Sequence, residues 1–265
     1  LSGAGQFRCR VSTDSPATAS MSYRSVAPAQ PWPVKTAPGA MPILDAPGDA
    51  VNLTILGSNA HVAGLDIRGS GGSNSNNYGI YGGDDKSNIV IEQTSITNAR
   101  VYGIFFWGNN SDITIRDMYI DAGLDGINLF RDNRNVTVAN TSIVNAGRYG
   151  IHLGIDNRFV TIADTMVTDS GTHGIYLNNG NRPVTITGTT VTNAGSSGIG
   201  FGVQNGVTVN DSILAGAFGA HGVQITGFNF VNGNGNTAAG ASFPSGDLCN
   251  DGGLNWSGQI EFDGV

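Results

Sequence analysis

Tyr149-Gly-Ile-His-Leu-Gly-Ile155 is followed 24 residues later by His173-Gly-Ile-Tyr-Leu-Asn-Asn179, and these two segments show the repeat that decides the fold. The Gly-Ile dipeptide, with Val in place of Ile at the last site, recurs every 23 or 24 residues, at Gly79, Gly103, Gly126, Gly150, Gly174, Gly198 and Gly222. A fixed period of this length is typical of solenoids, in which neighbouring repeats bury each other's apolar side.

Each repeat contains three short apolar stretches, for example Ile151-x-Leu153, Val160-x-Ile162 and Met166-Val167. Their alternation has period two, which predicts strands with one face inward. Stacked coils place equivalent strands about 4.8 Å apart in parallel sheets, and parallel crossovers are strongly biased to the right hand. The sequence therefore predicts an all-β, single-stranded right-handed parallel β-helix with coils of about 24 residues and three parallel sheets. One interior column would contain Ile80, Ile104, Ile127, Ile151, Ile175, Ile199 and Val223.

The repeat defines three segments of the chain. Residues 51–230 are predicted to form the β-helix, beginning with an irregular coil at 51–72. Residues 1–50 are rich in Pro, Ala and Ser without a period, and are predicted to be an irregular cap or arm. Residues 231–265 are predicted to be a C-terminal cap or tail. Open solenoid ends expose unpaired strand edges, so these flanks are the candidates to cover them.

Composition excludes several classes of protein. Only 12% of the residues are charged, 40 are glycine, and the net charge is −7. Scarce helix formers exclude a helical bundle, the acidic balance disfavours a nucleic-acid or anionic-membrane partner, and no apolar run is long enough to span a membrane. Cys9 and Cys249 fit no metal-ligand spacing. A disulfide between the two tails and two free thiols both remain open.

The positions flanking each Gly-Ile dipeptide carry the candidate functional residues. The residue before the glycine is Tyr78, Tyr102, Asp125, Tyr149, His173, Ser197 or His221. The residue after the Ile or Val is Tyr81, Phe105, Asn128, His152, Tyr176, Gly200 or Gln224. The second of these columns lies between two inward residues, so it is expected to point outward. Together the 14 positions hold three of the four histidines and five of the seven tyrosines. They predict a ligand-binding groove; an oligomer interface and simple stacking of rings between strands are the alternatives.

Polar pairs follow the same strands: Asp84-Asp85, Asn109-Asn110, Asp132-Asn133, Asp156-Asn157 and Asn178-Asn179. Asp and Asn favour turns, so turn formation is the first interpretation. No obligatory cofactor is expected, but Ca²⁺ takes carboxylate and carbonyl oxygens, and Asp84 with Asp85 is the best candidate pair. Arg134, Arg158 and Arg182 stand at equivalent loop positions, where a polyanion could bridge their stacked charges.

The coils resemble the right-handed parallel β-helix superfamily of pectate lyases, polygalacturonases and mannuronan C5-epimerases. The order Val-Tyr102-Gly, Leu-Asp125-Gly, Arg-Tyr149-Gly, Thr-His173-Gly is similar to the epimerase and alginate-lyase-like branch. That branch has Tyr-Gly-Phe-Asp-Pro-His followed by Leu-Asp-Gly and Arg-His-Gly coils. Here Tyr102-Gly103 continues as Ile104-Phe105-Phe106-Trp107, without the Asp and His, and Arg148-Tyr149-Gly150 stands in place of Arg-His-Gly.

This resemblance implies a polysaccharide ligand, and we expect a secreted, extracellular or periplasmic protein. A lyase or C5-epimerase acting on a uronate-containing polysaccharide is expected, with Tyr149 and either His152 or His173 as the acid–base pair. Asn128 and either Arg148 or Arg131 would hold and neutralise the uronate carboxylate. Further expected substrate-binding residues are Tyr78, Tyr81, Tyr102, Phe105, Trp107, Tyr176 and His221.

Two other functions remain open. A glycoside hydrolase would require Asp125 together with a loop carboxylate such as Asp132 or Asp156, because that reaction normally uses two carboxyl groups. A non-catalytic carbohydrate-binding or adhesion module would use the same groove without chemistry. The sequence carries no prediction of the oligomeric state.

Overall fold

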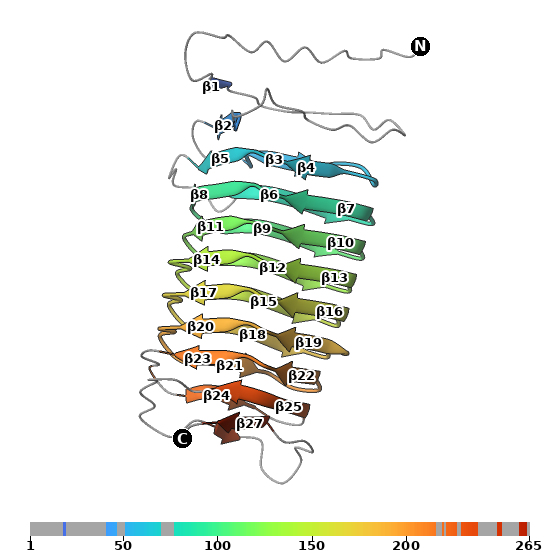
Figure 1. Cartoon of the computed structure of the whole chain (residues 1–265). Helices are drawn as coiled ribbons and strands as arrows, with labels where there is room; N and C mark the ends of the chain where they lie inside the picture. Colours follow the sequence, from blue (N-terminus) through green and yellow to red (C-terminus); the bar gives the residue numbers. More distant parts are fainter. Residues whose placement is uncertain are drawn as a thin grey trace.

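The coils of this chain stack directly on one another. A computed structural model describes residues 18–19, 41–46, 51–69, 77–215, 219, 221–226, 229–237, 248–250 and 260–263. All regular elements in these ranges are β-strands, wound into a right-handed parallel solenoid (Figure 1). The predicted fold class is thereby confirmed. The described residues include no helix with the length and apolar character needed to cross a membrane.

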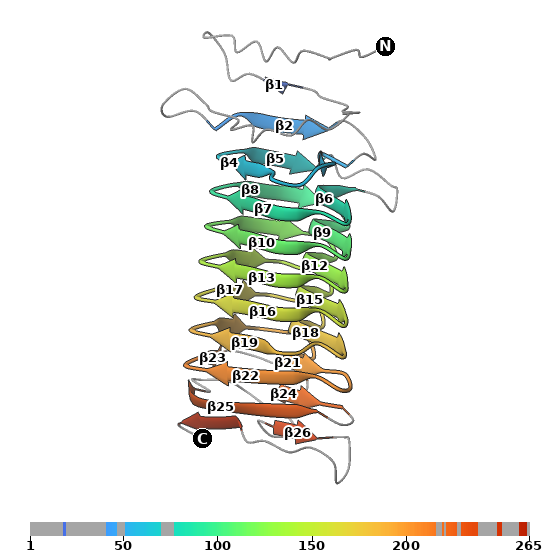
Figure 2. The ribbon, with the colours of Figure 1, turned by 90° about the vertical axis from the view of Figure 1, so that its right-hand side faces the viewer.

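Three columns of parallel strands form the walls. The first sheet contains β3 (Leu53–Ile55), β6 (Tyr78–Asp84), β9 (Tyr102–Gly108), β12 (Asp125–Arg131), β15 (Tyr149–Ile155), β18 (His173–Asn179), β21 (Ser197–Phe201), β24 (His221–Ile225) and β26 (Leu248–Asn250). The second sheet contains β4 (His61–Ala63), β7 (Ser87–Glu92), β10 (Ser111–Arg116), β13 (Arg134–Ala139), β16 (Arg158–Ala163), β19 (Val184–Thr187), β22 (Gly206–Asn210), β25 (Phe230–Thr237) and β27 (Ile260–Asp263). Figure 2 shows the second sheet facing the viewer.

The third sheet contains β1 (Thr18–Ala19), β2 (Ile43–Ala46), β5 (Asp66–Gly69), β8 (Ser95–Ala99), β11 (Tyr119–Ala122), β14 (Ser142–Val144), β17 (Met166–Thr168), β20 (Thr190–Thr192) and β23 (Ile213–Ala215). The second and third sheets join at β25, which pairs with both β22 and β23. Strands β1, β2, β26 and β27 lie in the segments predicted as caps and pair in parallel with the neighbouring strands. Cys9 and the side chain of Cys249 lie outside the described residues, so their pairing stays a prediction.

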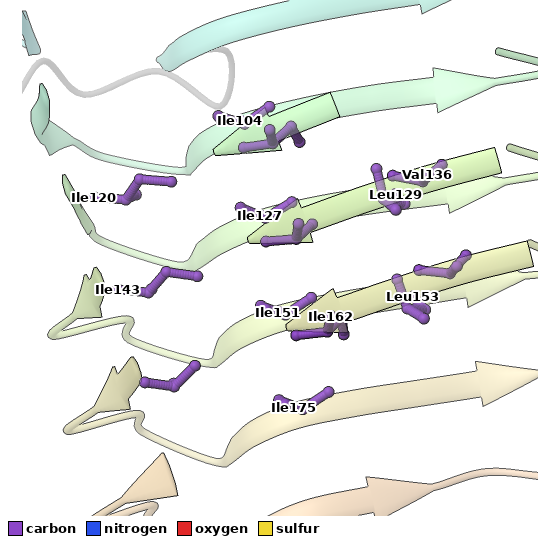
Figure 3. Close-up of a cluster of buried hydrophobic side chains, with 14 of the residues drawn as sticks. Ile104, Ile120, Ile127, Leu129, Val136, Ile143, Ile151, Leu153, Ile162 and Ile175 are labelled. Atoms are coloured by element: carbon purple, nitrogen blue, oxygen red, sulfur yellow. The ribbon is translucent and has the colours of Figure 1, made fainter. Parts of the chain in front are cut away.

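The core is a set of stacked aliphatic columns. Ile127, Ile151 and Ile175 are direct partners on β12, β15 and β18. The whole predicted column from Ile80 to Val223 is at most 1% exposed, and Figure 3 shows several of its members one above another. Each fully buried side chain of this kind contributes about 1.5–3 kcal/mol of hydrophobic stabilisation. The coils are therefore held in register by their own apolar faces.

A tight corner explains the glycine of the Gly-Ile repeat. A Cβ on Gly150 would lie 2.6 Å from the carbonyl oxygen of Gly174 in the next coil, and it would also overlap the side chain of Val167. The same close approach recurs at Gly103, Gly126 and Gly174. A residue with a side chain does not fit at this corner without a shift of the backbone, so the repeat keeps glycine there.

A ladder of buried asparagines fixes the turn between the first and second sheets. Its members are Asn110, Asn133, Asn157, Asn181 and Asn205, each 0% exposed. The Nδ2 of each donates to the Oδ1 of the next at 3.0–3.2 Å. The residue before the ladder position takes a positive φ, as at Asp132 (52°) and Asp156 (54°). The turn interpretation therefore holds for Asn109-Asn110, Asp132-Asn133 and Asp156-Asn157. In the other two pairs, Asp84 belongs to β6, and Asn178 and Asn179 belong to β18, where Gly180-Asn181 makes the turn.

Candidate functional site

The two predicted columns are in register on the first sheet. Asp125 lies between Tyr102 and Tyr149, its partners on the neighbouring coils. Asn128 lies between Phe105 and His152, three residues further along the same strands. The strands thus bring five kinds of polar and aromatic side chain together over β9, β12 and β15.

At the centre of the site a buried carboxylate is held by an arginine. Asp125 is 0% exposed, and Arg148 donates from Nε to Oδ1 at 2.8 Å and from Nη2 to Oδ2 at 2.6 Å. Burial would raise the pKa of Asp125, but the neighbouring side chains of His152 and Arg148 outweigh it and hold that pKa below its usual value. The same contact raises the pKa of Arg148. Both groups are therefore charged over the range of pH in which proteins normally work.

Asn128 links this ion pair to His152. Its Nδ2 donates to Asp125 Oδ2 at 2.7 Å and lies 3.0 Å from His152 Nδ1. Since the carboxylate fixes the orientation of the amide, Nδ1 is the acceptor of this second bond and the imidazole proton is assigned to Nε2. His152 Nε2 and Asn128 Oδ1 are buried and have no hydrogen-bond partner among the described residues. Unsatisfied buried polar atoms are rare, so two at one site indicate a place for a ligand or water.

Tyr149 is at the centre of a stack of rings beside this network. Its ring lies 4.8 Å from that of Tyr176 and 5.0 Å from that of His152, between centroids. The guanidinium carbon of Arg148 is 4.7 Å from the centroid of Tyr149, at cation–π distance. Burial raises the pKa of Tyr149, and the charge of Arg148 opposes that effect in part. The phenol is therefore protonated at neutral pH and has a cation beside it.

His173 has a different environment from His152. It is 8% exposed, and its ring stacks on Tyr176 and Tyr149 at centroid distances of 5.1 and 5.7 Å. Burial lowers its pKa to about 4, against a backbone hydrogen bond with Ser197 that raises it. A Cβ at Gly200 would lie only 3.1 Å from His173 Nδ1, so the neighbouring glycine makes room for this ring. Of the two predicted acid–base histidines, His152 is the one joined to Asp125, and His173 supports the stack.

The predicted sugar-binding rings form a second cluster towards the N-terminal coils. Tyr102 lies 5.1 Å from Tyr78 and 4.8 Å from Phe105 between ring centroids. Trp107 is 37% exposed, whereas Phe105 is 4% exposed. Phe105 therefore supports its neighbours and offers no open face to a sugar, while Trp107 does. Tyr81 is half-buried at the edge of this cluster, 5.8 Å from Phe105.

One member of this aromatic cluster, Phe130, was not among the residues predicted from the sequence. Phe130 lies 4.8 Å from Trp107 and 6.4 Å from Phe105 between centroids. It stands outside the two columns, next to Arg131, and only its position one residue beyond the inward Leu129 could have indicated an outward ring. Trp107 and Phe130 together extend the aromatic surface towards the turn that leads to the second sheet.

Other predicted residues lie away from the centre. Arg131 is exposed at the far end of β12, where its Cγ lies 3.0 Å from the place a Cβ of Gly108 would take. His221 begins β24, three coils from Tyr149, and its side chain lies outside the described residues. Asp84 and Asp85 are exposed, and Asp85 takes a turn conformation with φ 60°. The described residues contain no group of three or more His, Cys, Asp or Glu able to hold a metal ion, so calcium at this pair stays a prediction.

The arrangement of carboxylates bears on hydrolysis. Asp125 has both oxygens engaged and no exposed surface. Asp132 and Asp156 occupy positive-φ positions in the turns after β12 and β15. A glycosidase acid must reach the glycosidic oxygen, and Asp125 has no free oxygen to do so. Asp125 instead holds the side chains of Arg148 and Asn128 in position through its hydrogen bonds.

Comparison with known proteins places the chain in a family. Residues 53–243 match the model of the right handed beta helix region, and the chain belongs to that family. Among curated proteins no significant match is found.

Solved structures share the fold at low identity. The A-module of the mannuronan C-5 epimerase AlgE6 from Azotobacter vinelandii superposes with a TM-score of 0.55 and 16% identity, over 84% of this chain and 81% of that chain. The polygalacturonase from Erwinia carotovora gives a TM-score of 0.55 and 15% identity, over 86% and 78%. The catalytic unit of the GH87 α-1,3-glucanase from Streptomyces thermodiastaticus gives a TM-score of 0.54 and 16% identity over 81% of this chain, which spans 50% of that unit.

Proposed function

We propose that this protein is a polysaccharide-active enzyme, a lyase or C5-epimerase that acts on uronate units of an acidic polymer. The observation that carries the proposal is the Asp125 network, which fixes Arg148 and, through Asn128, His152, both of them next to the ring of Tyr149. The structural neighbours named above act, by their names, on mannuronan, polygalacturonate and α-1,3-glucan, and their shared fold supports a polysaccharide as the substrate class. Export from the cytoplasm, to the periplasm or the medium, is part of the proposal because such polymers lie outside the cell.

The site is rich in hydrogen-bond donors. Arg148 has five N–H donors, of which two bond to Asp125 and another contacts Tyr102. Tyr149 carries a phenolic proton, and His152 carries its proton on Nε2. The one carboxylate in the two columns, Asp125, is neutralised and covered. A carboxylate-bearing sugar complements such a set of donors better than a neutral sugar does.

The proposed chemistry begins with the uronate carboxylate bound at Arg148. Neutralising this carboxylate makes the proton at C5 more acidic and stabilises the enolate that forms when the proton leaves. Tyr149 accepts the C5 proton as the phenolate, whose charge the guanidinium 4.7 Å from the ring centroid stabilises. His152 supplies a proton from Nε2, and the phenol formed at Tyr149 returns a proton to that nitrogen, so that phenolate and neutral imidazole are both restored. If the proton from His152 goes to the glycosidic oxygen, the C4–O4 bond breaks and a C4–C5 double bond forms; if it goes to C5 on the opposite face, the sugar is epimerised.

The test measures product formation on polygalacturonate and on alginate. Elimination gives an unsaturated uronate with a new ultraviolet absorbance, and epimerisation in D₂O places deuterium at C5. Tyr149→Phe and His152→Gln should each lower the rate by about 10²-fold or more, the usual size of a lost acid–base group. Gln224→Ala, three coils away on β24, is the control and should retain the parental rate.

Three outcomes would contradict the proposal. Parental rates in both the Tyr149 and the His152 variant would remove these residues from the chemistry. New reducing ends without the unsaturated product would identify a hydrolase. Binding of the polymer with neither product would identify a non-catalytic binding or adhesion module.

A further inference from the structure

Apart from Arg100, the described arginines divide into two groups. Arg68, Arg116 and Arg148 are each paired with a carboxylate, that of Asp66, Glu92 or Asp125. Arg131, Arg134, Arg158 and Arg182 form no ion pair within the described residues, and all four are exposed. These four lie at one edge of the solenoid, around the turn from the first sheet to the second.

Three of them form a regular row along the solenoid axis. Arg134 and Arg158 are direct partners on β13 and β16. The backbone N–H of Arg134, Arg158 and Arg182 each donates to the carbonyl of the ladder asparagine one coil earlier, at 2.8–3.0 Å, so the three backbones are equivalent. Strand spacing places neighbouring members about 4.8 Å apart. Three unpaired like charges at that spacing repel one another unless an anion lies against them.

The asparagine ladder makes this row rigid. Asn133, Asn157 and Asn181 immediately precede the three arginines, are 0% exposed and are bonded to one another through their side chains. The backbone from which each arginine side chain extends is thus fixed before a ligand binds. Fixed positions reduce the entropy lost on binding, so such a row is preorganised.

The acidic groups near the row do not neutralise it. Asp132 and Asp156 lie on the same turns, beyond ion-pair distance of the arginines, and Asp156 leans towards Gly180 of the next coil. Asp112 is held by Asn135 Nδ2 at 3.0 Å and by Ser111. The row remains a local excess of positive charge in a protein of net charge −7.

An exposed ring stands beside the row. Phe159, next to Arg158, is 59% exposed and has φ 54°. Bulky residues rarely adopt positive φ, and the preceding coils have Asn135 and Asp112 at this place. An aromatic side chain here provides an apolar face of the kind on which a sugar ring can pack.

We propose that Arg134, Arg158 and Arg182, with Phe159, bind an extended stretch of a polysaccharide that carries one carboxylate per sugar unit. The row lies apart from Tyr149, because the seven residues of β15 span about 20 Å at about 3.3 Å per residue. It therefore anchors the polymer outside the catalytic network. The choice of an acidic polymer rests on the proposed function, but binding to the row requires no turnover.

The test compares two variants of equal charge. R134Q/R158Q removes two charges from the row, and R68Q/R116Q removes two charges elsewhere, so both bring the net charge from −7 to −9. The probe is polygalacturonate, with its methyl-esterified form as the neutral polymer. R134Q/R158Q should weaken binding of polygalacturonate at least tenfold and reduce its dependence on salt. R68Q/R116Q and R134K/R158K should stay within about twofold of the parent, and Phe159→Asn, the residue of the preceding coil, should weaken binding several-fold.

Binding and turnover separate this inference from the proposed function. R134Q/R158Q should leave the rate on a short uronate oligosaccharide unchanged while it weakens binding of the polymer. If the parent converts no uronate at all, the binding comparison still decides whether the arginine row binds the acidic polymer. Unchanged affinity and salt dependence in R134Q/R158Q would overturn the inference, as would equal binding of the esterified polymer. Tighter binding of duplex DNA than of polygalacturonate at the row would also overturn it.

Discussion

Arg148 and Asp125 form a bidentate ion pair whose two members differ in exposure. The guanidinium donates to both carboxylate oxygens, at 2.8 and 2.6 Å. The side chain of Arg148 is 35% exposed, whereas that of Asp125 is 0% exposed. A mutation of either residue leaves the other charge without its partner. Water can then hydrate the partly exposed arginine, but it cannot reach the buried carboxylate. The cost of breaking the pair should therefore depend on which partner is removed.

Arg148→Ala should destabilise the fold more than Asp125→Asn. The first change leaves a buried carboxylate without its main partner, which costs about 3 kcal/mol or more. The second leaves a neutral amide in the same space and an arginine that can turn to water, at a cost of about 1 kcal/mol. The free energies of unfolding in urea measure the difference. Equal losses, or a larger loss for Asp125→Asn, would show that the carboxylate is hydrated in solution.

His173 should make stability depend on pH. Its pKa is about 4 in the folded chain and about 6.5 when unfolded. Between these values the unfolded chain binds the proton and the folded chain does not, so stability falls as the pH drops from 6.5 to 4, by about 3 kcal/mol in total. His173→Gln should flatten this part of the profile, measured as urea midpoints at several pH values. An unchanged slope in the variant would assign the effect to other groups.

The repeat predicted which side chains point inward or outward better than it predicted how deeply each one is buried. Its period of two and its spacing of 24 residues indicated which side chains point inward, and Ile151 and its column do so. The same alternation indicated that Phe105, between the inward Ile104 and Phe106, points outward. It does, yet rings from coils stacked about 4.8 Å away cover it. Alternation along one strand cannot tell how far a neighbouring side chain leans over it.

The ion pair between side chains of neighbouring coils was not predicted from the sequence. Arg148 was assigned to a substrate carboxylate, whereas its Nε and Nη2 are bonded to Asp125, 23 residues earlier. The position of Asn181 was predictable: it lies 24 residues after Asn157, the period of the repeat, although Asn178-Asn179 is the adjacent pair of asparagines. The ion pair, in contrast, depends on side chains of different coils that meet only after stacking.

Asn157→Ala should show what the buried ladder contributes. The change removes the bonds of Asn157 to Asn181 and Asn133 and leaves buried polar groups unsatisfied, at a cost of about 1–3 kcal/mol. Asn178→Ala, outside the ladder on β18, is the matched control and should change stability by about 0.5 kcal/mol or less. Urea denaturation compares them. Similar losses in both variants would mean that water replaces the ladder bonds without cost.

The aromatic cluster should divide into support and binding surface. Phe105 is 4% exposed and contacts Tyr78, Tyr102 and Trp107. Phe105→Ala should therefore cost about 3 kcal/mol or more of stability. Trp107→Ala should change stability much less and weaken binding of an oligosaccharide. Thermal unfolding and titration calorimetry on the two variants separate the roles, and a reversed pattern would place the sugar elsewhere.

The reaction rate should rise with pH well above neutrality. Burial raises the pKa of Tyr149 above the usual value near 10, and Arg148 only partly opposes it. If the phenolate accepts the C5 proton, kcat/KM increases about tenfold per pH unit from pH 7 to 9, because the reactive fraction of Tyr149 does so. Tyr149→Phe should abolish this slope along with most of the rate, while Tyr176→Phe, the stacked neighbour, should keep it. A parental profile that is flat from pH 7 to 9, or that turns on near pH 6.5, would make an imidazole the base and leave Tyr149 to orient it.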